Sequence, residues 1–151
     1  MSIEARLTEK GITLPDAPAP AANYVPYVQS GNLIYVSGQI SSDENGLITG
    51  KLGDSMEVEA GAAAARRCGL ALIAQLRAAT GSLDKVKRVV KLTGFVNSTP
   101  DFTDQPKVIN GCSDLMVEVF GEAGAHARAA VSAPSLPMGV AVEIEAIFEV
   151  E

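Results

Sequence analysis

The strongest structural signal in the chain is a strict alternation of residue types near its C-terminus. Between Val140 and Val150 every even-numbered residue is apolar, while glutamates hold three of the five odd-numbered positions. Side chains of a strand point alternately to its two faces, so this period of two predicts a strand with one buried face. The chain must therefore build a sheet and cover one side of it.

Three further segments have the composition of strands. Residues 33–40 form a short apolar run rich in β-branched residues, and turn-forming residues stand on both sides of it. Residues 86–97 are rich in valine, and residues 127–133 are small and apolar. Each of these segments is predicted to add a strand to the sheet.

Two segments have the spacing of helices. Between residues 56 and 80, and again between 105 and 120, apolar side chains recur at steps of three and four. This spacing predicts two amphipathic helices. The first carries a narrow stripe of small residues, including Ala62, Ala65 and Gly69, which we expect to let that helix lie close on the sheet.

The order of these elements predicts an α+β fold: one sheet of five or six strands with two helices packed on one face. Two helices cover only one side of such a sheet, and a bare opposite side would expose a larger apolar patch than monomers tolerate. We therefore expect a homo-oligomer.

The chain has 151 residues, the size of one domain. Residues 15–20 contain three prolines, which exclude a helix interior and favour an extended path. We expect residues 1–20 to form a covering arm and residues 21–151 to form a single domain.

Composition narrows the function classes. The formal net charge is −6, from 12 basic and 18 acidic residues, and this opposes docking on nucleic acid. No apolar run approaches the roughly 20 residues that cross a bilayer, so no membrane partner is expected. With two cysteines and no apolar leader, the chain is expected in the reducing cytoplasm.

Arg128 is the most conspicuous candidate for a binding residue, because it interrupts the small apolar strand 127–133. A guanidinium in such a place calls for an anionic partner, and its planar fork suits a carboxylate. The alternatives are an ion pair with Glu143 or Glu145 on a neighbouring strand, or simple exposure to solvent. The two glutamates share one face of their strand. There they would either hold a water or a proton, or form the solvent-exposed side of the sheet.

Other polar residues have weaker signals. Tyr24 and Tyr27 flank the entry to the first strand, where they would either close over a ligand or pack. Cys112 falls on the buried face of its helix, so a raised thiol pKa is expected and no nucleophilic role. His126 is the single histidine, lacks the Cys or Asp spacing of a metal site, and is expected to be structural.

Three blocks of the chain together resemble the Rid family of reactive-intermediate (enamine and imine) deaminases. The family is also called YjgF and carries endoribonuclease L-PSP and translation-inhibitor names. The blocks cover residues 24–39, which end in Ser-Gly-Gln, residues 89–102, and residues 128–147, where an arginine precedes Leu-Pro and Val-Glu-Ile-Glu. The third block is the most specific of the three.

The resemblance implies a chorismate-mutase-like fold with a single mixed sheet, assembled as a homotrimer with ligand clefts between subunits. It implies hydrolysis of 2-imino or enamine acids, such as 2-aminoacrylate, to 2-keto acids and ammonia. The partner is then a small imine or keto acid with a carboxylate, and neither a metal nor an organic cofactor is required. The N-terminal arm goes beyond the compact family pattern and indicates a divergent subgroup.

Three residues match family positions that contact or activate the substrate. Arg128 matches the arginine that holds the carboxylate, and Glu143 matches the glutamate that assists the attacking water. Tyr24 matches the cleft tyrosine when the first block is aligned without gaps. Tyr27 takes that place only with a gap of three residues.

Four further positions are implied as substrate contacts. Ser37 and Gly38 match the Ser-Gly-Gln strand end. Asn110 matches a helix asparagine if extra residues are allowed between 99 and 107. Ala130 stands where family members carry cysteine, so a main-chain contact survives there without the side-chain chemistry.

Two alternatives from other classes stay open at this point. One is a regulatory trimer that binds small carboxylates at Arg128 without turnover. The other is an endoribonuclease or translation inhibitor, against which the negative net charge, the single histidine and the lack of tryptophan argue.

Overall fold

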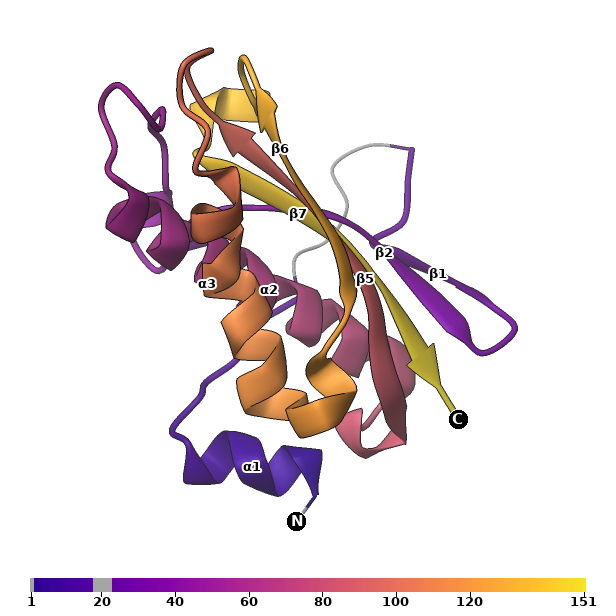
Figure 1. Cartoon of the computed structure of the whole chain (residues 1–151). Coiled ribbons are helices and arrows are strands. Elements are labelled where there is room, and N and C mark those ends of the chain that lie inside the picture. The colour runs from indigo at the N-terminus through magenta and orange to yellow at the C-terminus, as the bar shows by residue number, and fades with distance from the viewer. Residues whose placement is uncertain (1, 18–22) are drawn as a thin grey trace.

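A computed structural model describes residues 2–17 and 23–151 of the chain (Figure 1). The α-helices are α1 (Ile3–Glu9), α2 (Val58–Thr80) and α3 (Gln105–Phe120). The strands are β1 (Tyr27–Ser30), β2 (Leu33–Ile40), β3 (Ser42–Asp43), β4 (Gly46–Leu47), β5 (Val86–Asn97), β6 (Ala127–Ala133) and β7 (Val142–Val150). Short 3-10 turns are η1 (Leu83–Lys85), η2 (Gly121–Gly124) and η3 (Pro137–Gly139).

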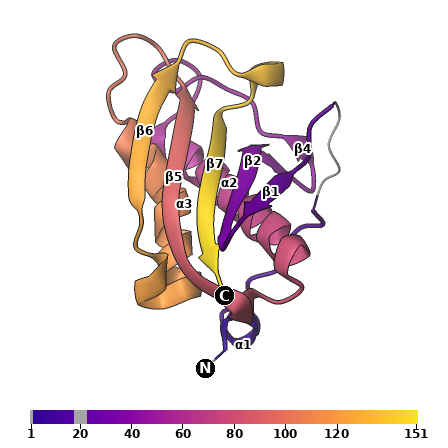
Figure 2. The ribbon, with the colours of Figure 1, turned by 90° about the vertical axis from the view of Figure 1, so that its right-hand side faces the viewer.

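Five strands form one mixed sheet in the order β1-β2-β7-β5-β6. All neighbours pair antiparallel except β5 and β6, which run parallel. Helices α2 and α3 both lie on one face of this sheet, and Figure 2 looks onto the opposite face. The predicted α+β class, with two helices packed on one face, is confirmed.

The predicted alternation in the C-terminal strand is confirmed, because its even-numbered side chains are buried against the two helices. The strand begins at Val142, two residues later than predicted, because Val140 follows the η3 turn and bridges to Thr49. Within residues 2–17 and 23–151, no helix is long and apolar enough to cross a membrane.

The face of the sheet away from the helices carries apolar side chains at its surface. Val28, Tyr35 and Ile147 are aligned across β1, β2 and β7 on this face. Val28 and Tyr35 keep 53% and 42% of their surface exposed. This bare face is the feature from which an oligomer was predicted, and the oligomer itself stays a prediction.

The small residues of α2 serve a different contact from the one predicted. A side chain added at Gly69 would meet Cys112 and Leu115, and one added at Gly111 would overlap the carbonyl oxygen of Ala62. These residues lie where α2 meets α3, so the prediction that the stripe brings α2 close to the sheet is wrong at Ala62 and Gly69. The absence of side chains there sets the separation of the two helices.

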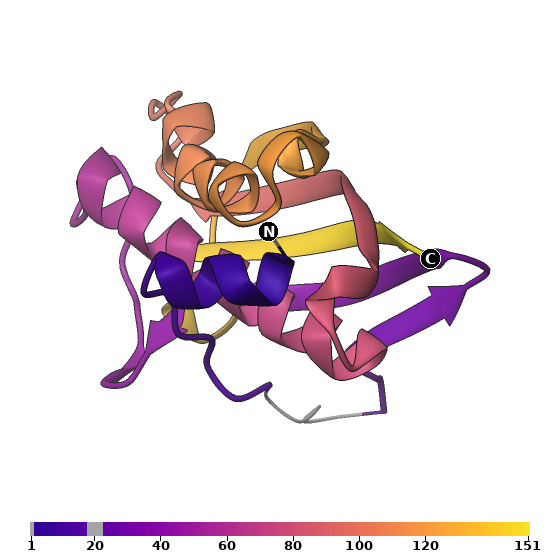
Figure 3. The same ribbon diagram turned by 90° about the horizontal axis from the view of Figure 1, so that it is seen from below.

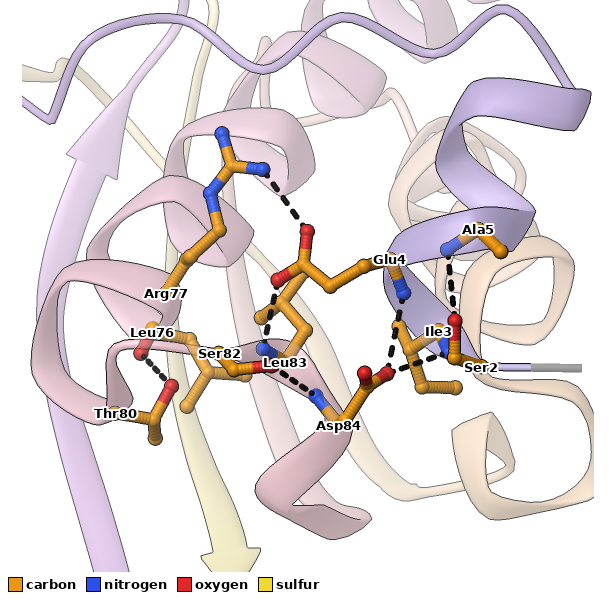
Figure 4. Close-up of polar contacts among 10 residues, drawn as sticks. All are labelled: Ser2, Ile3, Glu4, Ala5, Leu76, Arg77, Thr80, Ser82, Leu83 and Asp84. Carbon is orange, nitrogen blue, oxygen red and sulfur yellow. Dashed lines mark hydrogen bonds and ion pairs between the residues drawn. The ribbon is translucent and has the colours of Figure 1, made fainter.

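Helix α1 lies across the ends of α2 and α3 (Figure 3). This helix is not among the elements predicted from the sequence. Its buried anchor is Leu7. Asp84 Oδ1 accepts hydrogen bonds from the main-chain nitrogens of Ile3 and Glu4, while Glu4 pairs with Arg77 and accepts from Leu83 N (Figure 4). The predicted boundary between residues 20 and 21 lies outside the described residues, so the division into an arm and a domain stays a prediction.

Candidate functional site

The most connected polar group of the predicted site lies between the edge strand β6 and helix α3. Arg128 on β6 donates from Nη1 to Asn110 Oδ1 at 2.7 Å and to Ser113 Oγ at 3.2 Å. We call Asn110, Ser113, His126 and Arg128 the arginine cluster. The predicted residues Arg128 and Asn110 are thus in direct contact.

The sheet register explains why Arg128 faces α3. Parallel pairing aligns Arg128 with Leu92 of β5, and Leu92 is a core residue beneath the helices. Residues aligned across two strands share a face of the sheet, so Arg128 lies on the helix side of the edge strand. The alternative that Arg128 pairs with Glu143 or Glu145 is wrong, because β5 separates their strands and both glutamates face the opposite side.

Two members of the arginine cluster were not predicted as site residues. His126 Nε2 lies 2.9 Å from Ser113 Oγ, and His126 Nδ1 lies 2.6 Å from the carbonyl oxygen of Gly124. A carbonyl only accepts, so Nδ1 carries the ring proton, and in the neutral ring Nε2 accepts from the Ser113 hydroxyl. The single histidine therefore contacts the cluster through Ser113.

Arg128 also acts on a neighbouring thiol. Burial raises the pKa of Cys112 to about 12, and the nearby charge of Arg128 opposes this rise. The expectation of a buried thiol with a raised pKa is confirmed. Ala130, two residues beyond Arg128 on the same face, is half-buried against the core and pairs with Gly94.

The other predicted residues gather around a bulge in β2. The register between β2 and β7 shifts between Val36 and Gln39, a step that contains Ser37 and Gly38. A side chain at Gly38 would clash with the Glu143 carboxylate, so that carboxylate lies directly over the glycine. Burial, and secondarily the charge of Glu145, raise the pKa of Glu143 above its ordinary value.

Ser37 ties this bulge to the segment before β1. Its hydroxyl donates to Val25 O at 2.8 Å, and its main-chain nitrogen donates to Pro26 O at 2.9 Å. Tyr24, next to Val25, keeps 53% of its surface exposed, whereas Tyr27 is half-buried against the core. Of the two tyrosines, Tyr24 is the one whose surface is open to a ligand or a partner.

A single chain does not bring the arginine cluster and the residues at the β2 bulge together. Arg128 and Asn110 lie on the helix side of one edge of the sheet, while Glu143 and Gly38 lie at β7 and β2 on the other side. Their joint action would need a second chain. Within the part of the chain that the structure describes, no group of three or more His, Cys, Asp or Glu side chains could hold a metal ion.

The fold and these residues define the class of protein. A family model described as "YjgF/chorismate_mutase-like, putative endoribonuclease" matches residues 4–149. The chain belongs to this YjgF family, which is also called Rid or RutC. The match begins one residue into α1, so the prediction that the N-terminal arm goes beyond the family pattern is wrong.

Three proteins are similar to this chain over at least nine-tenths of its length. Protein TCP17 of Trypanosoma cruzi is 54% identical over 149 residues, covering 97% of this chain and 93% of that protein. The 2-iminobutanoate/2-iminopropanoate deaminase of Escherichia coli K12 is 36% identical over 140 residues, covering 91% and 95%. The crystal structure of Atu1372 from Agrobacterium tumefaciens, of unknown function, matches with a TM-score of 0.89 and 48% identity, covering 99% and 94%.

Proposed function

We propose that this protein is a deaminase that hydrolyses 2-imino acids to 2-keto acids and ammonia. The coarse part of this proposal is supported by relatives named 2-iminobutanoate/2-iminopropanoate deaminase at 33% and 36% identity. The finer part, which concerns the residues and the assembly, rests on the geometry of the arginine cluster and the β2 bulge.

The observation that carries the proposal is the way Arg128 is held. Its hydrogen bonds to described residues all leave from Nη1, toward α3. The Nε–H and one Nη2–H point along the other edge of the planar guanidinium, where they match the two oxygens of a carboxylate. Arg128 is thus fixed on one side and open on the other, as a receptor for an organic acid.

Glu143 supplies the second function, the handling of protons. As a carboxylate it accepts a proton from water as the water oxygen bonds to the imine carbon. Glu143 then gives this proton to the nitrogen of the carbinolamine. As the C–N bond breaks and ammonia leaves, the Glu143 carboxylate takes the hydroxyl proton, and the carbon keeps the oxygen as a ketone. The raised pKa of Glu143 makes it a better base and lets it return the proton.

The assembly follows from the separation of the two groups. In the proposed homotrimer the bare faces of the sheets meet, and a cleft between subunits joins the arginine cluster of one chain to the β2 bulge of the next. The exposed apolar row of Val28 and Tyr35 supports burial of this face in a partner. Sedimentation that gives the mass of a single chain at micromolar concentration would contradict the assembly.

The activity is tested by generating 2-aminoacrylate with a serine dehydratase and following keto-acid release. We expect Arg128→Ala to lower kcat/KM by at least about 30-fold, the loss of a charged bidentate contact. Arg128→Lys keeps the charge without the fork, and Arg66→Ala removes only a surface ion pair with Glu118. Equal rates for wild type and Arg128→Ala would end the proposal, whereas binding of 2-oxobutanoate without turnover would favour a regulatory trimer.

A further inference from the structure

The direction in which Arg128 points depends on a hydroxyl group. Two acceptors hold its Nη1, the Asn110 side-chain oxygen and Ser113 Oγ. The amide oxygen can only accept, but the hydroxyl carries a proton whose position is free to rotate. A serine within a helix can also turn its hydroxyl toward the carbonyl one turn earlier, which competes with any outward contact.

His126 removes this freedom. With its Nδ1 proton committed to Gly124 O, its Nε2 is an acceptor 2.9 Å from Ser113 Oγ. The hydroxyl proton therefore points to the ring, and the lone pairs of Ser113 Oγ are left for Arg128. The direction of these hydrogen bonds is fixed at one end by the main-chain carbonyl of Gly124, because a carbonyl oxygen can accept a hydrogen bond but cannot donate one.

We propose that Ser113 and His126 are positioning residues that fix the carboxylate-binding edge of Arg128. This inference rests on the proposed function, because it assigns a task to the same arginine. Neither residue touches the ligand. His126 acts only through Ser113, and Ser113 acts only through Arg128.

We call the hydrogen-bonded series from His126 through Ser113 to Arg128 the relay. It determines which ligands bind more tightly. A guanidinium held at two points keeps its Nε and Nη2 donors in one plane, which favours a planar carboxylate bound through both oxygens. If Ser113 is lost, Asn110 alone holds Nη1, and the group rotates about that single contact. Ligands with a carboxylate then lose affinity, while neutral analogues of the same shape do not.

The test measures binding, so that it does not depend on turnover. The full chain is titrated calorimetrically with 2-oxobutanoate and with its neutral amide, 2-oxobutanamide. Ser113→Ala and His126→Ala are each expected to weaken 2-oxobutanoate binding about threefold to tenfold, as expected for one hydrogen bond. Binding of the amide is expected to change less than twofold, and Ser113→Thr, which keeps the hydroxyl, is expected to bind the acid like wild type.

The double variant is the sharpest readout. Because His126 acts through Ser113, the combined Ser113→Ala and His126→Ala protein is expected to bind 2-oxobutanoate no more weakly than Ser113→Ala alone. Two merely structural defects at separate contacts would add instead. Glu118→Gln, on the same helix, is the matched control, since it breaks only the surface pair with Arg66.

A spectroscopic measurement covers variants that fail to fold. His126 is the single histidine of the chain, so its ring nitrogen resonances are unambiguous in the wild-type protein. We expect the neutral ring to carry its proton on Nδ1. A proton on Nε2 would overturn the relay.

The outcomes separate the two proposals. If Arg128→Ala loses binding while Ser113→Ala and His126→Ala bind like wild type, the relay is overturned and the proposed function stands. Additive losses in the double variant also overturn the relay. If Arg128→Ala itself binds 2-oxobutanoate like wild type, the proposed function fails and the relay fails with it.

Discussion

Replacing Gly111 by alanine has two opposite effects on the free energy of unfolding. In an exposed helix the change would stabilise the protein by about 1 kcal/mol, because glycine is a poor helix former. Gly111, however, lies in α3 where this helix meets α2. An added Cβ would overlap the carbonyl oxygen of Ala62 and lie 2.7 Å from its carbonyl carbon. These are main-chain atoms, so no side-chain rotation relieves the overlap.

The distances around Gly111 give the size of the expected loss in stability. Carbon atoms in contact normally lie about 3.5 to 4.0 Å apart, so the two helices must separate by about 1 Å. Overpacking of this kind costs about 3 kcal/mol where the backbone has to move. After the gain in helix propensity, a net destabilisation of about 2 kcal/mol remains, which lowers Tm by about 4 to 8 °C for a chain of this size.

Urea and thermal unfolding of the Gly111→Ala protein measure this loss. Gly61→Ala is the matched control, because a Cβ there would meet only the side-chain ends of Leu52 at 3.0 Å and Val108 at 3.2 Å. Those side chains can shift, so we expect its stability to stay within about 1 kcal/mol of wild type. A Gly111→Ala protein as stable as wild type would refute the role assigned to the helix contact.

Three further expectations follow from the described contacts. Asp84→Ala removes the acceptor of two main-chain donors of α1 and should lower the unfolding free energy by about 1 kcal/mol, unlike the exposed control Asp54→Ala. Burial raises the folded-state pKa of Glu143, so the stability it contributes is complete below its unfolded value of 4.5 and is lost as the pH rises through the folded value. Glu143→Gln should therefore gain stability over wild type as the pH rises above 4.5, and a pH-independent difference would contradict this. Burial raises the pKa of both Cys68 and Cys112, so iodoacetamide should label neither thiol in the native protein at about pH 8, but both after unfolding.

Local patterns in the sequence were sufficient for most of the fold. The alternation that ends at Val150 lies within one strand, and the three-and-four spacing of residues 105–120 lies within one helix. The structure has α3 over those predicted residues. Helix α1 escaped prediction because its seven residues hold little periodicity. Its place is set by contacts with Asp84 and Arg77, which lie more than 70 residues away in the sequence.

Candidate site residues could be named from the sequence, but their arrangement in space could not. The place of Arg128 in an apolar strand marks it as a candidate, and resemblance to the family adds Asn110 and a role for Glu143. Arg128 and Asn110 are in contact. The sequence does not show that Arg128 and Glu143 lie on opposite faces, because that depends on the register of β5 with both neighbours. A single histidine without the Cys or Asp spacing of a metal site predicts only a structural role for His126. Its partner Ser113 lies 13 residues earlier in the chain, and the η2 turn lies between the two.

The position of β7 has a consequence for biosynthesis. The last strand of the chain lies in the middle of the sheet, where β2 and β5 pair with its two sides. Until β7 has been synthesised, both of those strands expose unpaired backbone groups, the kind of edge that recruits foreign strands. The sheet therefore cannot close before β7 has left the ribosome, and a chain truncated before β7 would present two adhesive edges to its neighbours.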